Sequence, residues 1–193
     1  TSMVGQVTYG KSVKIGSTFF FPWSDDGSSG YELWKSDGTA AGTVMVKDIY
    51  SGSGNGYPES LTAVGNNVYF TANDGTHGNE LWKSDGTDTG TVMVKDINGG
   101  SSGSAINYLT AVGNTLFFRA YDATHGYELW KSDGTASGTV MVKDINSGSS
   151  TSLIQLLTPI GNTIYFQAND GVHGQELWKS DGTASGTVMV KDI

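Results

Sequence analysis

The octapeptide ELWKSDGT occurs four times in this chain, at 32–39, 80–87, 128–135 and 176–183. Each copy begins 48 residues after the previous one, and a second invariant run, VMVKDI, closes every period. A period of roughly 20–50 residues indicates an architecture of repeated structural units. The chain of 193 residues is therefore predicted to be a single repeat domain of four units. Their approximate bounds are 1–49, 50–97, 98–145 and 146–193.

Each unit is predicted to contain four short strands joined by tight turns. In the second unit, Gly65-Asn66 separates the apolar runs SLTAV and NVYF, and Gly113-Asn114 and Gly161-Asn162 repeat the pattern. Such dipeptides indicate two-residue hairpins, because they tolerate the positive φ that primed turns need. The runs NDGTHG and DGTDTG supply two further turns before the strands ELWKS and TVMVK.

The fold class predicted from these units is all-β, a β-propeller with four-stranded antiparallel blades. The strands carry consecutive apolar residues, which indicates that both faces of each sheet are covered. The links between units are long and rich in Gly and Ser, as a propeller needs to pass from the outer strand of one blade to the inner strand of the next. An up-and-down barrel would alternate, and a solenoid would not need three hairpin turns per unit.

The sequence does not determine the number of blades in the ring. Propellers contain about four to eight blades. Either the four units close one small ring, or a homodimer completes or stacks a larger ring.

Composition excludes several classes of function. The chain has 19 acidic and 11 basic residues and a formal charge of −8, so no nucleic-acid partner is expected. It has no cysteine, and therefore neither a disulfide nor a thiolate site. No apolar run is long enough for membrane insertion, and the segment TSMVGQVTYG does not read as a signal peptide.

The segments NDGTHGNELWKSDGTDTGTVMVKDI and NDGVHGQELWKSDGTASGTVMVKDI resemble the ELWxxDGT repeat family of long bacterial proteins. The resemblance covers nearly the whole chain. It implies a β-propeller-like fold, an extracellular or cell-surface location, no enzymatic activity and no agreed ligand. The first unit departs from the family pattern, because it is one residue longer between Gly16 and Trp34 and lacks the histidine of the other three.

The four tryptophans are the first candidate ligand-binding residues. In a strand, Glu80, Trp82 and Ser84 share one face, and Leu81 and Lys83 share the other. On the structural interpretation, the apolar side chains fill the space between blades, while Glu and Lys satisfy buried polar groups or pair with each other. On the alternative interpretation, the repeated aromatics form carbohydrate sites between blades. The tryptophans are Trp34, Trp82, Trp130 and Trp178.

The second candidate set is the three histidines His77, His125 and His173. Their spacing matches no local metal motif, so turn packing is the preferred interpretation and no metal site is predicted. The aspartates of KSDGT are predicted to cap turns: Asp37, Asp85, Asp133 and Asp181. Asp25-Asp26-Gly27, Asp74-Gly75 and Asp170-Gly171 lack the spacing of an EF-hand, so no cofactor is predicted beyond weak calcium binding.

The sequence contains no nucleophile elbow and no phosphate loop, so no enzyme is predicted. The first hypothesis is a non-enzymatic extracellular scaffold or adhesion module. The alternative is a multivalent carbohydrate-binding propeller with a glycan or surface partner. Positions that differ between units could shape a specific partner site: Pro22, Trp23, Tyr31, Asn79, Arg119, Tyr121, Tyr127 and Gln175.

Overall fold

A computed structural model describes residues 12–25 and 28–193, and within these ranges it contains four antiparallel four-stranded sheets and no helix. The strands of each sheet follow one another in sequence order, so every sheet is a meander. The predicted all-β class is therefore confirmed. The described part of the chain has no helix long and apolar enough to cross a membrane.

The strand bounds fall within the 48-residue repeats. The first sheet contains β1 (Val13–Ile15), β2 (Thr18–Ser24), β3 (Tyr31–Ser36) and β4 (Val44–Lys47). The second contains β5 (Glu59–Val64), β6 (Asn67–Asn73), β7 (Asn79–Ser84) and β8 (Val92–Lys95). The third contains β9 (Asn107–Val112), β10 (Thr115–Asp122), β11 (Gly126–Ser132) and β12 (Val140–Lys143). The fourth contains β13 (Gln155–Ile160), β14 (Thr163–Asn169), β15 (Gln175–Ser180) and β16 (Val188–Lys191).

The predicted Gly-Asn hairpins are present. Val64 pairs with Asn67 across Gly65-Asn66, and Ile160 pairs with Thr163 across Gly161-Asn162. Only the glycine takes a positive φ, of 59° in both turns, as at the first central position of a type II′ turn.

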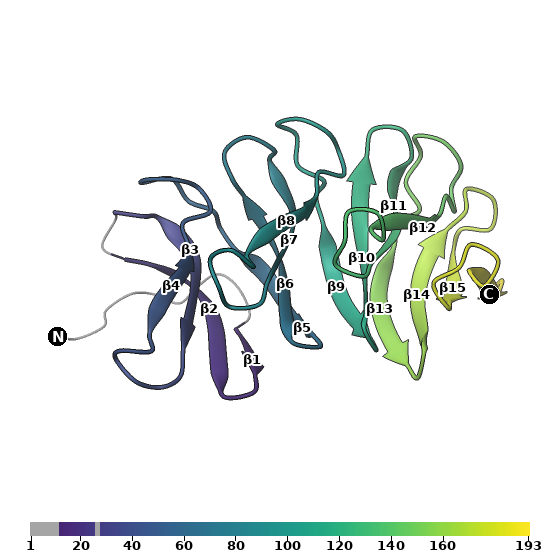
Figure 1. Cartoon of the computed structure of the whole chain (residues 1–193). Helices are drawn as coiled ribbons and strands as arrows, with labels where there is room; N and C mark the ends of the chain where they lie inside the picture. Colours follow the sequence, from purple (N-terminus) through teal and green to yellow (C-terminus); the bar gives the residue numbers. More distant parts are fainter. Residues whose placement is uncertain (1–11, 26–27) are drawn as a thin grey trace. The chain divides into compact units, whose positions relative to one another are not determined.

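The chain divides into two compact units. One contains the residues up to Met93 together with 100–103, and the other contains 94–99 and 104–193. The first unit thus holds the first sheet and nearly all of the second, and the second unit holds the third and fourth sheets (Figure 1).

The core of the first unit lies between its two sheets. Leu33 lies on the face of β3 that points to the second sheet, where Phe70 and Trp82 belong to the same apolar cluster. The other members include Phe20, Val46 and Ile49 from the first repeat and Leu61, Val68 and Ala72 from the second. Leucine of one repeat and tryptophan of the next are therefore opposite walls of one interface.

The second unit repeats this core with equivalent residues. Leu129 of the third sheet shares a cluster with Phe166 and Trp178 of the fourth. The first strands of successive sheets lie beside each other in both units, β1 beside β5 and β9 beside β13. Each first strand of the last three sheets also has a register shift, next to a residue with positive φ: Ser60, Tyr108 and Leu156.

Candidate functional site

The four tryptophans lie on one face of the third strand of each sheet. Trp82, Trp130 and Trp178 are 6–7% exposed, whereas Trp34 is half-buried. The indole Nε1 of all four is buried without a hydrogen-bond partner among the described residues. The rings of Trp82 and Trp178 therefore supply apolar volume to the two cores, as the structural interpretation expects.

The glutamate of ELWKS holds the link that leads to the next sheet. Glu32 is fully buried, and its carboxylate accepts backbone N–H groups from Ile49 (2.9 Å), Tyr50 (3.3 Å) and Gly56 (2.8 Å). Glu128 accepts the N–H of Ile145 in the same way (3.0 Å). The glutamate thus satisfies buried polar groups, which is the first of the two roles considered from the sequence.

Burial raises the pKa of Glu32 and that of Glu128 to about 7, because a desolvated carboxylate is disfavoured in its charged form. The backbone N–H donors oppose this rise, since they bind the charged form better. Both carboxyl groups lie inside the protein, where they bind the chain's own backbone. This geometry offers a substrate no access to them.

Lys35, Lys47 and Lys143 contact the following sheet within their units. In the first unit, Lys35 Nζ lies 2.7 Å from the carbonyl oxygen of Gly86, and Lys47 Nζ lies 3.1 Å from Asp88 Oδ1. In the second unit, Lys143 Nζ donates to the carbonyl oxygen of Thr187 at 2.9 Å. These three lysines therefore bind backbone carbonyl groups and Asp88, and none of the three contacts is an ion pair with the glutamate of ELWKS.

The aspartate of KSDGT organises the third turn of each repeat. Asp85 Oδ1 accepts the backbone N–H and the hydroxyl of Thr87, and Thr87 Oγ1 accepts the N–H of Gly90. These hydrogen bonds hold the pKa of Asp85 below its usual value. The same contacts occur at Asp37, Asp133 and Asp181. The predicted turn-capping role is confirmed.

The three histidines also serve turns. His77 Nδ1 lies 2.7 Å from Asp74 Oδ2, and the backbone N–H of His77 donates to Asp74 Oδ1. His125 pairs with Asp122 at 3.0 Å, and His173 pairs with Asp170 at 2.7 Å. The partnership with His173 helps hold the pKa of Asp170 down to about 2, and the same contact raises the pKa of His173.

The first repeat builds the equivalent turn with serines. Asp25 accepts the hydroxyl of Ser28 at 2.8 Å and the backbone N–H of Ser29 at 3.0 Å. The extra residue of this repeat lies in the same turn, between Ser24 and Tyr31. The Asp26-Gly27 part of the calcium-like motif lies outside the described residues. Across residues 12–25 and 28–193, no group of three or more His, Asp or Glu side chains is placed to hold a metal ion.

One cluster of unequal residues comes together in the second unit. The guanidinium of Arg119 lies 5.0 Å from the ring centroid of Tyr108 and 4.9 Å from that of Tyr127. Tyr121 packs against Tyr127 with centroids 5.1 Å apart. Arg119 also donates to the carbonyl oxygen of Ile154 at 3.3 Å. The sequence singled out Arg119, Tyr121 and Tyr127 as unequal positions, but it missed Tyr108, which the strand irregularity in β9 presents to them.

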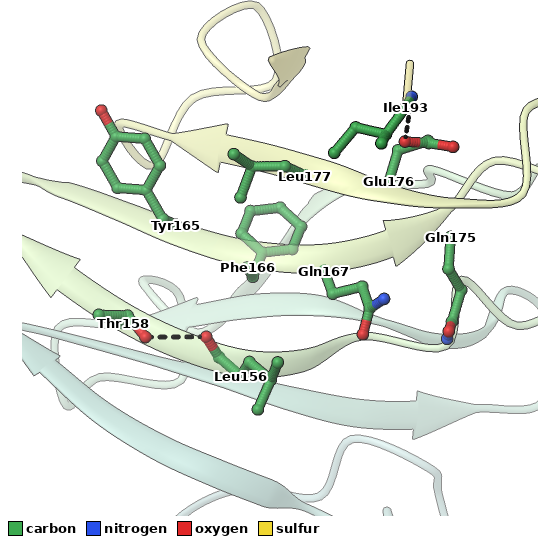
Figure 2. A pocket seen from close by; sticks show the side chains of 9 residues that line it. All are labelled: Leu156, Thr158, Tyr165, Phe166, Gln167, Gln175, Glu176, Leu177 and Ile193. Atoms are coloured by element: carbon green, nitrogen blue, oxygen red, sulfur yellow. Dashed lines mark hydrogen bonds between the residues drawn. The ribbon is translucent and has the colours of Figure 1, made fainter. Parts of the chain in front are cut away.

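One face of the fourth sheet carries exposed apolar side chains, among them Leu156, Ile160 and Leu177. An open hollow of about 350 Å³ lies on it, lined among others by Leu156, Tyr165, Gln167, Leu177 and Ile193. Figure 2 shows Leu177 and Tyr165 among the side chains that line the hollow, with Glu176 bonded to the backbone of Ile193. The identical repeats gave no sign that this leucine would differ from its equivalents.

Comparison with known proteins identifies a shared fold only. No family model and no curated protein matches the chain. The computationally designed Ika8 protein matches with a TM-score of 0.51 and 18% identity, covering 94% of this chain and 48% of that chain. A structure from a study of two prolyl endopeptidases matches with a TM-score of 0.54 and 11% identity, covering 90% of this chain and 24% of that chain. The chain thus spans about half and about a quarter of these proteins, respectively.

Proposed function

We propose that the chain is a non-enzymatic interaction scaffold whose sheets are blades of a β-propeller. Three features support the propeller. Each sheet is a four-stranded meander, first strands of successive sheets are neighbours within each unit, and a sheet buries its leucine face against the tryptophan face of the next. Blades around an axis have these relations.

One observation supports the scaffold role above the others: the chemically capable residues of the repeated motif are used to hold the fold. The glutamate binds the link, the aspartate binds its own turn, and Lys35 and Lys143 bind the neighbouring sheet. A group engaged in this way has no free acid, base or nucleophile to offer. The extracellular or cell-surface location is proposed on the resemblance of the repeats alone.

The scaffold proposal is tested by assaying the purified chain against panels of glycoside, peptide and ester substrates. We expect no turnover above background. Turnover that is lost in a single carboxylate variant such as Glu59→Gln, with thermal stability unchanged, would show an active site and overturn the proposal.

The second candidate function is carbohydrate binding, and the Arg119 cluster is the observation that favours it. Aromatic rings beside a planar cation offer stacking surfaces and hydrogen-bond donors, which sugars bearing a carboxylate would use. This candidate places one site in the third repeat instead of four equivalent sites at the tryptophans, three of which are buried.

A glycan array followed by titration calorimetry tests this candidate. Arg119→Gln gives the third repeat the residue that the fourth has at position 167, so the fold is expected to persist. Carbohydrate binding at the cluster predicts at least a tenfold loss of affinity in this variant, while Gln167→Ala serves as the control. Absence of any glycan ligand would leave the scaffold as the better proposal.

A further inference from the structure

A polar cleft lies between the third and fourth sheets, inside the second unit, and has a volume of about 300 Å³. Its polar lining consists of Asn114 and Thr115 from the β9–β10 hairpin, Lys131 from β11, Asn162 from the β13–β14 hairpin and Asp181 from the turn after β15. Strands β9 and β13 lie beside each other, and the two hairpin turns lie at the same end of the unit (Figure 1). The repeated Gly-Asn turns thus bring polar side chains of two sheets to one place.

The amide side chains of these two turns are not used inside the protein. Asn114 and Asn162 are exposed, and neither side chain makes a hydrogen bond within residues 12–25 and 28–193. An amide group offers both hydrogen-bond donors and an acceptor. The cleft therefore presents one unpaired amide from each sheet.

Lys131 carries an ammonium group that the protein does not use either. Its equivalent in the first unit, Lys35, donates to the carbonyl oxygen of Gly86 at 2.7 Å. Lys131 donates no side-chain hydrogen bond to any residue that the structure describes. Hydrogen bonds from Thr183 hold the pKa of Asp181 below its usual value, and the nearby charge of Lys131 adds to this effect. The ammonium of Lys131 thus lies close to a carboxylate but remains available to a ligand.

Gly182 keeps the cleft free of a further side chain. Its φ is 90°, and a Cβ there would lie 3.1 Å from the ring of Phe117 and 3.7 Å from Cδ of Lys131. Phe117 and Val112 are both buried and add apolar surface to the lining. Apolar surface with a few placed polar groups is the usual composition of a small-molecule site.

The charges in the cleft favour a neutral ligand. Lys131 contributes one positive charge and Asp181 one negative charge, and the whole chain has a formal charge of −8, so the cleft has no excess positive charge for an anion. Hydroxyl groups both donate and accept hydrogen bonds, and the amides, the ammonium and the carboxylate together supply both kinds of partner. The volume is at the lower limit of ligand pockets, which is about 300 Å³. We propose that this cleft binds one unit of a neutral saccharide through its hydroxyl groups.

The cleft is separate from the Arg119 cluster. The two sites share no residue, and Thr115 lies four positions before Arg119 along β10, which is about 13 Å in a strand. The first unit does not repeat the cleft in the same form, because Ser17 replaces Asn114 and Lys35 is bound to Gly86. The proposal therefore stands independently of the scaffold role and of carbohydrate binding at Arg119.

Heteronuclear NMR of the isotope-labelled chain tests the proposal. The probes are glucose, galactose, mannose and N-acetylglucosamine, with glycine and acetate as charged comparison compounds. We expect at least one sugar to cause saturable shifts, with millimolar affinity, in the side-chain amide signals of Asn114 and Asn162 and the backbone amide signal of Gly182. The backbone amide signals of Tyr121 and Tyr127 should not move.

Two variants measure the contribution of the cleft residues. Lys131→Met removes the ammonium but keeps a side chain that packs beside Phe117, and it should weaken sugar binding about tenfold, as expected for one hydrogen bond from a charged group. Asn162→Ala should weaken binding about fivefold. Lys35→Met and Asn66→Ala are the matched controls, because they change the equivalent residues of the first unit, and they should leave the affinity unchanged.

The dispersion of the NMR spectrum shows whether each variant is folded. Three results would overturn the proposal. The first is that no neutral sugar shifts the cleft signals, or that glycine or acetate shifts them and the sugars do not. The second is an affinity that Lys131→Met and Asn162→Ala leave unchanged. The third is sugar-induced shifts at Tyr121 and Tyr127 that disappear in Arg119→Gln, which would place the binding at the Arg119 cluster instead.

Discussion

At the scale of single residues, the buried glutamates show how one side chain can fix a long connection. Glu32 binds three backbone N–H groups from a link that has no strand of its own. A buried backbone donor without a partner costs about 1–3 kcal/mol. By accepting these N–H groups, the carboxylate removes that cost and stabilises the folded conformation of the link. The pattern of the sequence identified a polar residue on a buried face, but not which groups it would bind.

The raised pKa of Glu128 leads to a pH-dependent stability. The folded protein holds this proton to about pH 7, and the group's ordinary pKa is 4.5. The folded state therefore binds more protons between these values, and the free energy of unfolding falls as the pH rises from about 4.5 to about 7. After allowance for solvent screening, the fall amounts to about 2 kcal/mol.

Urea unfolding of Glu128→Gln at several pH values between 4.5 and 7.5 measures this effect. The variant should be less stable overall but should show a smaller fall over that range. Glu59→Gln controls for the loss of one surface charge. Equal falls in the native protein and in Glu128→Gln would contradict the assignment.

The aspartate turn makes a second prediction at this scale. A Cβ added to Gly90 would lie so close to the carboxylate of Asp85 that this side chain would have to move. Gly90→Ala should therefore destabilise the protein by about 1–2 kcal/mol, because the Asp85 side chain must leave its hydrogen bonds. In a double-mutant cycle measured by thermal unfolding, the variant with both Asp85→Ala and Gly90→Ala should lose less than the sum of the single changes.

At the scale of elements, the hairpins are where local sequence and local structure agree best. Gly161 has a φ of 59° and open space where a Cβ would be. Any penalty of a side chain there comes from the backbone conformation alone. Gly161→Ala should thus cost about 1 kcal/mol of stability, while Asn162→Ala should be nearly neutral. Thermal unfolding measures both, and equal effects would show that the turn is not held in this conformation.

The strands themselves depend on their surroundings. Strand β6 buries residues on both faces, as consecutive apolar residues predict, whereas β14 alternates between buried and half-buried side chains. Strand β15 alternates between buried and exposed side chains, although its core ELWKS matches that of β11. Identical sequence therefore yields one-sided or two-sided burial according to what packs against each face of the strand.

At the scale of the whole molecule, substitution of equivalent leucines measures how much stability the burial of this side chain contributes in different sheets. Leu33→Ala and Leu129→Ala each create a cavity in a core and should cost about 2–5 kcal/mol. Leu177→Ala should cost less than about 1 kcal/mol in the monomeric state, because its side chain already contacts water. Urea unfolding at low protein concentration compares the three variants, and equal losses would mean that the leucine face of the fourth sheet is covered.

The sequence by itself determined the four repeats, the antiparallel meander of each and the turns between strands. These features depend on short-range chemistry: Gly at positive φ, Asp beside its own turn and apolar residues in strand order. Only the tertiary structure decided which face of a sheet is covered, which backbone groups Glu32 binds and that Arg119 joins three tyrosines. Those outcomes depend on contacts between distant segments, and a residue repeated identically in four places cannot by itself encode which copy is buried.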